Sequence, residues 1–158
     1  MHRIGFGTDI HRLVAGRALI IGGVEIESDL GSEGHSDADV LMHAVTDAVL
    51  GALALGDLGS HFPDDEERWK NAESSQFLRY AISLINQKGY KVANIDSVVD
   101  LEMPKLRPHI DAMRNNLAAA LEIEIDRVSI KAKTGEKIDG VGESRAIRAQ
   151  ALVLLTHQ

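Results

Sequence analysis

The stretch SDADVLMHAVTDAVLGALAL, residues 36–55, carries the clearest secondary-structure signal in the chain. Its apolar side chains recur at helical spacing and cover most of the circumference, which is typical of a buried helix. The residues that form this pattern are Val40, Leu41, Ala44, Val45, Ala48, Val49, Ala52 and Leu53. Ser36 or Asp37 is expected to cap the first turn, because both side chains accept hydrogen bonds from free backbone N–H groups. The stretch therefore predicts a helix inside the hydrophobic core.

The segments on either side of this helix predict a mixture of strands and further helices. Strands are expected over 2–7 and 18–26, the latter turning at Gly22-Gly23, and turn residues mark 56–69 as a loop. The other expected elements are a helix over 73–88 ended by Gly89, a strand over 92–102, a helix within 107–121 that opens near Pro108, and strands over 127–134 and 147–155. Hairpins that alternate with helices favour an α/β (α+β) fold in which helices pack on one face of a mixed β-sheet.

The composition excludes several classes of protein and of site. The chain has 158 residues, 44% of them hydrophobic and 26% charged, which is ordinary for one globular domain spanning residues 1–158. It has no cysteine, so a metal must rest on imidazole and carboxylate groups. The formal charge of −7 argues against a nucleic-acid partner. Without a signal peptide or a membrane-length apolar run, a cytoplasmic protein with no membrane partner is expected.

Polar residues interrupt the buried helix and the strand that precedes it. Asp39, His43 and Asp47 follow one another at steps of four and form one polar stripe, whereas Asp9 and His11 lie two apart on an extended chain and point the same way. Two imidazoles and a carboxylate, from Asp9, His11 and His43, suit zinc with one position open for substrate. Asp39 or Asp47 would then accept the second N–H of His43. The alternatives are a structural hydrogen-bond ladder or a solvated strip.

Three further segments have both a binding and a structural interpretation. His35 and Ser36, just before the helix, suit a phosphate held at a helix N-terminus, or they are simple capping residues. Residues 134–136 end a strand with a hydroxyl, a glycine and a carboxylate, which suit one ligand or an ordinary polar turn. The loop over 101–107 would wrap a flat base around Pro104, or it merely connects a strand to a helix.

These segments together resemble one family over nearly the whole chain, the 2-C-methyl-D-erythritol 2,4-cyclodiphosphate synthases of the non-mevalonate isoprenoid pathway. The resemblance rests on GTDIH, IIGGVEI, MPKLRPHI, IKAKTGEK and the long, specific block GHSDADVLMHAVTDAVLGALALGDLGSHFPDD over 34–65. It implies a homotrimer whose sheets face the threefold axis and whose active sites lie between protomers. It also implies a zinc ion held by Asp9, His11 and His43, the same set that the residue pattern suggests.

The resemblance assigns roles to further residues. It implies that His35 and Thr134 are catalytic, and that Glu136 meets the diphosphate through a second divalent ion, magnesium or manganese. Asp64 would take the erythritol hydroxyls and the 101–107 loop would take the cytidine. The substrate-binding positions implied are Asp9, His11, His35, Ser36, Asp57, Leu58, Gly59, Phe62, Pro63, Asp64, Asp65, Glu66, Leu101, Glu102, Met103, Pro104, Lys105, Leu106, Arg107, Lys133, Thr134, Gly135 and Glu136.

The implied reaction is an intramolecular phosphoryl transfer by a phosphorus–oxygen lyase. The 2-phosphate of 4-diphosphocytidyl-2-C-methyl-D-erythritol 2-phosphate attacks the β-phosphorus, CMP leaves, and a cyclic diphosphate closes. Two metals that neutralise phosphate oxygens suffice for such chemistry, which needs no protein nucleophile. Two other functions stay open: a zinc hydrolase acting on a phosphoester, and a non-catalytic trimer that binds isoprenoid diphosphates or nucleotides.

The chain departs from the family pattern after Lys137. The stretch EKIDGVGESR, residues 136–145, lacks the aromatic residue and the arginine before Gly-Glu that many family members carry. Phosphate contacts and an axial channel pocket belong to this region in the family. Whether Arg145 substitutes for the missing arginine stays open, and no contact is assigned there.

Overall fold

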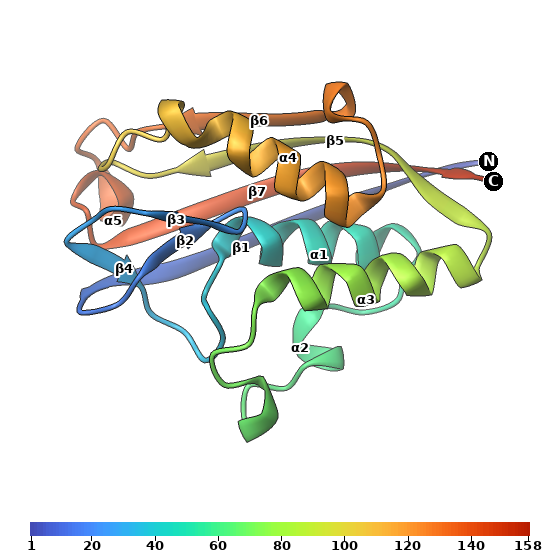
Figure 1. Cartoon of the computed structure of the whole chain (residues 1–158), viewed down its shortest axis with the longest axis horizontal. Helices are drawn as coiled ribbons and strands as arrows, with labels where there is room; N and C mark the ends of the chain where they lie inside the picture. The colour runs from blue at the N-terminus through green and yellow to red at the C-terminus, as the bar shows by residue number, and fades with distance from the viewer.

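A computed structural model of residues 1–158 shows a five-stranded mixed sheet with the strand order β4-β1-β7-β5-β6 (Figure 1). Only β5 and β6 run parallel, whereas the other neighbouring pairs in this sheet are antiparallel. A separate hairpin pairs β2 with β3. The strands are β1 (His2–Ala15), β2 (Leu19–Ile21), β3 (Val24–Ile26), β4 (Leu30–Ser32), β5 (Tyr90–Asp100), β6 (Val128–Lys133) and β7 (Ala146–His157). The mixed α/β architecture expected from the sequence is confirmed.

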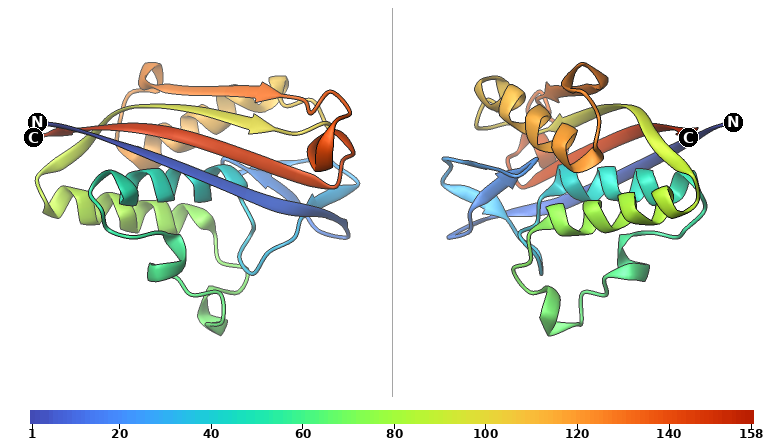
Figure 2. Two further views of the ribbon diagram at one scale, coloured as in Figure 1. Left: turned by 180° about the vertical axis from the view of Figure 1, so that it is seen from behind. Right: turned by 45° about the vertical axis from the view of Figure 1, so that its right-hand side comes forward.

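The three long helices cover one face of this sheet, and the opposite face carries none of them (Figure 2). They are α1 (Val40–Ala52), α3 (Ser74–Gln87) and α4 (Ile110–Leu121). Helix α1 packs directly on β1 and β7, and almost all its side chains are buried, as its pattern predicts. The short elements are α2 (Leu58–His61), α5 (Asp139–Gly142) and the 3₁₀ turns η1 (Glu67–Trp69), η2 (Arg107–His109) and η3 (Ile125–Arg127). None of the helices combines the length and the apolar character needed to cross a membrane.

Several expected boundaries are corrected. Helix α1 spans 40–52 rather than 36–55, because Ala38 and Ala54 adopt positive φ angles of 55° and interrupt the helix at both ends. The cap is therefore Asp39, and the expectation of Ser36 or Asp37 is wrong. The first strand continues to residue 15 instead of ending at 7, since it pairs with β7 from His2 to Arg12. The expected loop over 56–69 contains α2 and η1.

Asp39 joins the start of α1 to the β2–β3 hairpin. Its carboxylate accepts hydrogen bonds from the first-turn N–H groups of Leu41 and Met42, at 3.2 and 3.0 Å, and from those of Gly22 and Gly23, at 2.9 and 2.6 Å. Both glycines have positive φ angles, 58° and 71°, which a two-residue hairpin turn requires. The side chain is fully buried, and this burial raises its pKa despite the N–H groups, which lower it.

Glycines in β1 allow α1 to lie directly against the sheet. A Cβ atom on Gly5 would lie 1.8 Å from the carbonyl oxygen of Ala48, and one on Gly7 would lie 2.0 Å from that of Ala44. Because side chains alternate along a strand, the next residue on this face after Gly7 is Asp9. The close approach of helix and strand therefore brings Asp9 beside the first turns of α1.

The substitution Gly5→Ala is expected to lower the free energy of unfolding by about 2–3 kcal/mol, because the new methyl group forces the strand away from the helix backbone. Gly51→Ala is the matched control, since the only atom near its Cβ is the Phe6 carbonyl oxygen at 4.0 Å. Alanine in a helix should stabilise the protein there by about 0.5–1 kcal/mol. Urea denaturation measures both values, and equal stabilities of the two variants would contradict the close packing.

Candidate metal site and ligand cavity

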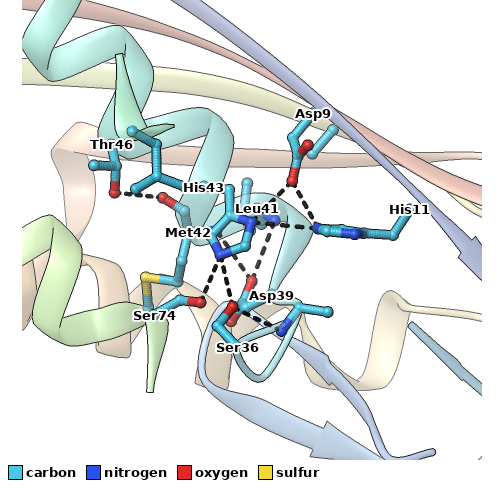
Figure 3. A network of polar contacts seen from close by, with 12 residues as sticks. Asp9, His11, Ser36, Asp39, Leu41, Met42, His43, Thr46 and Ser74 are labelled. Atoms are coloured by element: carbon cyan, nitrogen blue, oxygen red, sulfur yellow. Dashed lines mark hydrogen bonds and ion pairs between the residues drawn. The ribbon is translucent and has the colours of Figure 1, made fainter. Parts of the chain in front are cut away.

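Asp9, His11 and His43 point toward one another at the junction of β1 and α1 (Figure 3). Oδ2 of Asp9 lies 2.8 Å from Nε2 of His11 and 3.0 Å from Nδ1 of His43, and the two ring nitrogens are 3.3 Å apart. A tetrahedral Zn²⁺ ion with bonds of about 2.0–2.1 Å needs ligand atoms about 3.3 Å apart. The spacing and the donor atoms of this triad therefore fit the expected ion, and which metal it binds stays a prediction.

The outer ring nitrogens of both histidines have partners of their own. Nδ1 of His11 lies 2.9 Å from the carbonyl oxygen of Glu33, an acceptor, so Nδ1 carries the proton and Nε2 is left as a ligand. Nε2 of His43 lies 2.8 Å from Oγ of Ser74 and 3.2 Å from Oγ of Ser36. Such outer contacts fix ring orientation and are typical of metal-binding histidines.

The expected partners of His43 are corrected by this geometry. Asp39 is occupied by four backbone N–H groups, and Oδ1 of Asp47 accepts a hydrogen bond of 2.6 Å from the N–H of Leu58. Neither carboxylate contacts the imidazole, although both lie one helical turn away. The role assigned to them falls instead to Ser74 and Ser36. No sequence signal pointed to Ser74, since a serine at a helix start is normally interpreted as a capping residue.

The charges of the triad favour an ionised Asp9. Burial by itself would raise the Asp9 pKa, but hydrogen bonds and positive charge from His11 and His43 outweigh it and lower the pKa to about 2. Burial by itself would lower the His11 pKa, but its bond to Asp9 prevails, so the pKa is raised above the ordinary 6.5. In the metal-free protein the carboxylate thus attracts protons to the same nitrogens that a metal would use.

Zinc affinity is expected to fall as the pH is lowered through the neutral range. Zinc binds only the neutral imidazole, and the raised pKa of His11 lets a proton compete at higher pH than for a free imidazole. Below that pKa, zinc must displace a proton from His11, so the zinc affinity should fall about tenfold for each unit by which the pH is lowered. Competition titrations with a metal indicator at pH 8, 7 and 6 measure the effect. An affinity that does not change over this range would contradict a histidine ligand.

His35 and Ser36 lie beside the triad, but not at the helix terminus where they were expected. Nε2 of His35 lies 3.0 Å from the carbonyl oxygen of Glu66, and its backbone carbonyl accepts from the N–H of Asn71 at 2.8 Å. Ser36 is 7% exposed and its hydroxyl faces His43. His35 therefore contacts the 57–73 segment and Ser36 contacts His43 of the triad, and neither caps α1.

The 57–73 segment is anchored through aromatic packing. The ring of Phe62 lies 4.4 Å from that of Phe77, 5.0 Å from that of Trp69 and 5.3 Å from that of Tyr80. Asp57 caps α2, so Leu58 and Gly59 lie in its first turn. Among the remaining predicted substrate contacts, Asp64 and Asp65 are exposed and Pro63 and Glu66 are half-buried. Aromatic contacts thus hold the 57–73 segment in place, and the segment exposes the carboxylates of Asp64 and Asp65.

The predicted cytidine loop lines a cavity of about 650 Å³ beside the carboxyl end of β6. Loop and strand are joined by the N–H of Leu101, which donates to the carbonyl of Lys133 at 2.9 Å. The side chain of Glu102 accepts from the N–H of Gly135 at 3.0 Å, and the Met103–Pro104 peptide is cis. The lining residues from these segments are Leu101, Pro104, Lys105, Leu106, Arg107, Ile130, Lys131, Ala132, Lys133 and Thr134. Most of the predicted contacts from the two segments therefore line one cavity, whereas Glu102, Met103, Gly135 and Glu136 are not among its lining residues.

Thr134 and Glu136 are also in contact, since the Thr134 hydroxyl donates to Oε1 of Glu136 at 3.0 Å. Glu136 adopts a positive φ of 51° and is exposed, so its carboxylate is available to a ligand. Arg145, left open as a phosphate contact, pairs with Glu143 at 2.6 Å. Thr134 thus belongs both to the cavity and to the Glu136 pair.

The cavity and the triad occupy the same end of the sheet on different strands. Asp9 of β1 and Val99 of β5 both pair with Ala149 of β7, and Val99 pairs in turn with Ala132 of β6. Neighbouring strands lie about 4.8 Å apart, so β1 and β6 are about 14 Å apart across three steps.

Comparisons with known proteins agree with the resemblance seen in the sequence. The YgbB family profile matches residues 2–156. The chain is 54% identical over 153 residues to the 2-C-methyl-D-erythritol 2,4-cyclodiphosphate synthase of Solibacter usitatus, covering 97% of this chain and 96% of that protein. A solved synthase of that name with CDP bound superposes with a TM-score of 0.90 at 41% identity, covering 98% of this chain and all of that one. The bifunctional IspDF of Campylobacter jejuni superposes at 0.96 and 36% identity, with this chain covered fully and 43% of that protein matched.

Proposed function

The chain belongs to the YgbB family of 2-C-methyl-D-erythritol 2,4-cyclodiphosphate synthases, and we propose that it catalyses the reaction that gives those enzymes their name. The substrate is 4-diphosphocytidyl-2-C-methyl-D-erythritol 2-phosphate. An oxygen of the 2-phosphate forms a bond to the β-phosphorus, and the bond from that phosphorus to the bridging oxygen breaks. CMP leaves with the electron pair of that bond, and the cyclic diphosphate serves isoprenoid precursor synthesis by the non-mevalonate pathway.

The observation that carries the proposal is the triad of Asp9, His11 and His43 with its nitrogen and carboxylate atoms 2.8–3.3 Å apart. Zinc held there, with magnesium or manganese bound through Glu136 and the diphosphate, would neutralise phosphate oxygens in a phosphoryl transfer. Three protein ligands leave a position for a substrate oxygen, which is typical of a catalytic rather than a structural site.

The other residues of the site would bind and orient the substrate. The cavity of about 650 Å³ is large enough for a nucleoside, and Lys105 and Lys133 on its lining offer positive charge to phosphates. The Thr134 hydroxyl and the His35 imidazole would each donate to a phosphate oxygen. Asp64 would accept from the erythritol hydroxyls. Holding both ends of one molecule folds the 2-phosphate back toward the β-phosphorus.

We further propose that the active protein is a homotrimer whose sites lie between protomers. The sheet face without helices exposes large apolar side chains: Ile4 (71% exposed), Phe6 (58%), Ile10 (59%) and Leu152 (48%). An apolar sheet face of this kind favours burial against another subunit. The separation of about 14 Å between β1 and β6 also supports a site completed by a neighbouring copy, whose cavity would face this triad.

Light scattering should then give a mass three times that of the chain, and Phe6→Asp should reduce it to that of a monomer with loss of turnover. Ser83→Asp on the exposed side of α3 is the control and should leave the trimer intact. An active monomer would contradict a shared site.

The function itself is tested by incubating the protein with the CDP-linked substrate and following phosphorus resonances and CMP. Stoichiometric CMP and a cyclic diphosphate are expected. A zinc phosphoesterase would instead release inorganic phosphate or open-chain phosphates. A non-catalytic trimer would bind CMP without turnover. Either of these results would overturn the proposal.

A further inference from the structure

The ring of His43 is held from the side opposite the predicted metal. Its Nδ1 faces Asp9 at 3.0 Å, and its Nε2 faces the hydroxyls of Ser74 at 2.8 Å and Ser36 at 3.2 Å (Figure 3). An imidazole that binds a metal through Nδ1 must carry its proton on Nε2. The oxygen of one of the two serines must therefore accept a hydrogen bond from this N–H.

The surroundings of Ser74 make it the acceptor. Its hydroxyl is hydrogen-bonded to Oδ1 of Asp37, and its backbone N–H donates to Oδ2 of the same carboxylate at 2.9 Å. An ionised carboxylate only accepts hydrogen bonds, so the hydroxyl proton points to Asp37 and the Ser74 oxygen is left to accept from His43. A hydroxyl that donates to a carboxylate is also a stronger acceptor, because successive hydrogen bonds polarise one another.

Burial makes this arrangement rigid. Ser74 is fully buried and His43 is 8% exposed, so water does not compete freely for the imidazole N–H. Ser36 is the weaker partner, since its contact with His43 is longer and its oxygen also accepts from the N–H of Ala38 at 3.2 Å. The chain of bonds thus runs from Asp37 through Ser74 to His43.

We propose that Ser74, held by Asp37, is the positioning residue of this metal site. It selects the Nε2–H form of His43 and directs Nδ1 toward Asp9 and His11. This inference rests on the ligand set of the proposed function and deepens it. Partners in this position typically contribute 10–100-fold to metal affinity.

The test is zinc affinity, measured on the full chain by competition with a chelator. Ser74→Ala is expected to weaken zinc binding 10–100-fold, and Ser36→Ala to weaken it less. Ser75→Ala is the matched control, since its hydroxyl accepts only from Arg79 on the surface at 2.8 Å, and it should bind zinc like the unaltered protein. The Co²⁺ absorption spectrum gives a second readout, and it should change in Ser74→Ala alone. Unchanged zinc affinity in Ser74→Ala would overturn the proposal.

Asp37→Asn tests the same chain of bonds with Ser74 in place. Because Asp37 acts through Ser74, the double variant that combines Asp37→Asn with Ser74→Ala should lose no more zinc affinity than Ser74→Ala alone. If the losses of zinc affinity in the two single variants multiplied in the double variant, the proposed chain of hydrogen bonds from Asp37 through Ser74 to His43 would be overturned. If the unaltered protein bound no zinc, the ligand set of the proposed function would fail together with the positioning role of Ser74. If His43→Ala lost zinc and Ser74→Ala did not, only the positioning role would fail.

Discussion

Replacing His43 with alanine is expected to abolish zinc binding and to lower kcat at least about 10³-fold, because the charge stabilisation that a metal supplies is worth several kcal/mol. The imidazole supplies one of only two nitrogen ligands in the triad. An aspartate and one histidine leave a site too poor in donors to hold zinc at micromolar concentrations. Metal analysis of the purified variant and a CMP-release assay measure the two losses together.

The fold should survive this substitution and the removal of zinc by a chelator. The triad lies on β1 and α1, which are held together by the core and by the close approach at Gly5 and Gly7. Circular dichroism of the chelated protein should therefore match that of the loaded protein, unlike a zinc finger, which unfolds without its metal. His157→Ala at the end of β7 is the control and should keep both zinc and activity. A His43→Ala protein with full zinc content and full rate would mean that the ligands have been misassigned.

Thr134→Ala and Glu136→Gln are expected to lower kcat about 10²–10³-fold while changing CMP affinity little. The Thr134 hydroxyl donates a hydrogen bond of 3.0 Å to Glu136 just after β6, and Thr134 lies at the margin of the predicted base cavity, whereas Glu136 is not among its lining residues. Contacts that strengthen only as charge redistributes in the transition state affect kcat rather than binding. Removing one such donor from other enzymes costs a rate factor of about this size.

Glu136→Gln should also weaken the dependence of the rate on added magnesium, since a neutral amide is a poor ligand for a hard cation. Magnesium titrations of kcat measure this, and CMP affinity is measured alongside by calorimetry. Glu143→Gln, which alters an exposed carboxylate paired with Arg145, is the control. Normal turnover combined with poor CMP binding in both variants would mean that the 101–107 and 134–136 segments have been assigned the wrong way round.

The sequence by itself determined the elements that build the site. The helical spacing of apolar residues over 40–53 predicted the burial of α1, since a helix that is apolar on most sides must be covered. The two-residue spacing of Asp9 and His11 placed their side chains on one face of a strand. The residue pattern therefore offered Asp9, His11 and His43 as candidate ligands beside a structural hydrogen-bond ladder or a solvated strip, and the family resemblance implied the same three residues. The family resemblance supplied the substrate, which the residue pattern did not identify.

The tertiary structure alone decided which polar groups meet. Asp39 and Asp47 lie one turn from His43, yet backbone N–H groups from Gly22, Gly23 and Leu58 occupy them. The partner of His43 is Ser74, 31 residues away in the sequence. Periodicity predicts the face on which a side chain lies, because that depends on local backbone geometry. A hydrogen bond depends on a few tenths of an ångström between segments distant in sequence, and those distances are set only when the whole core packs.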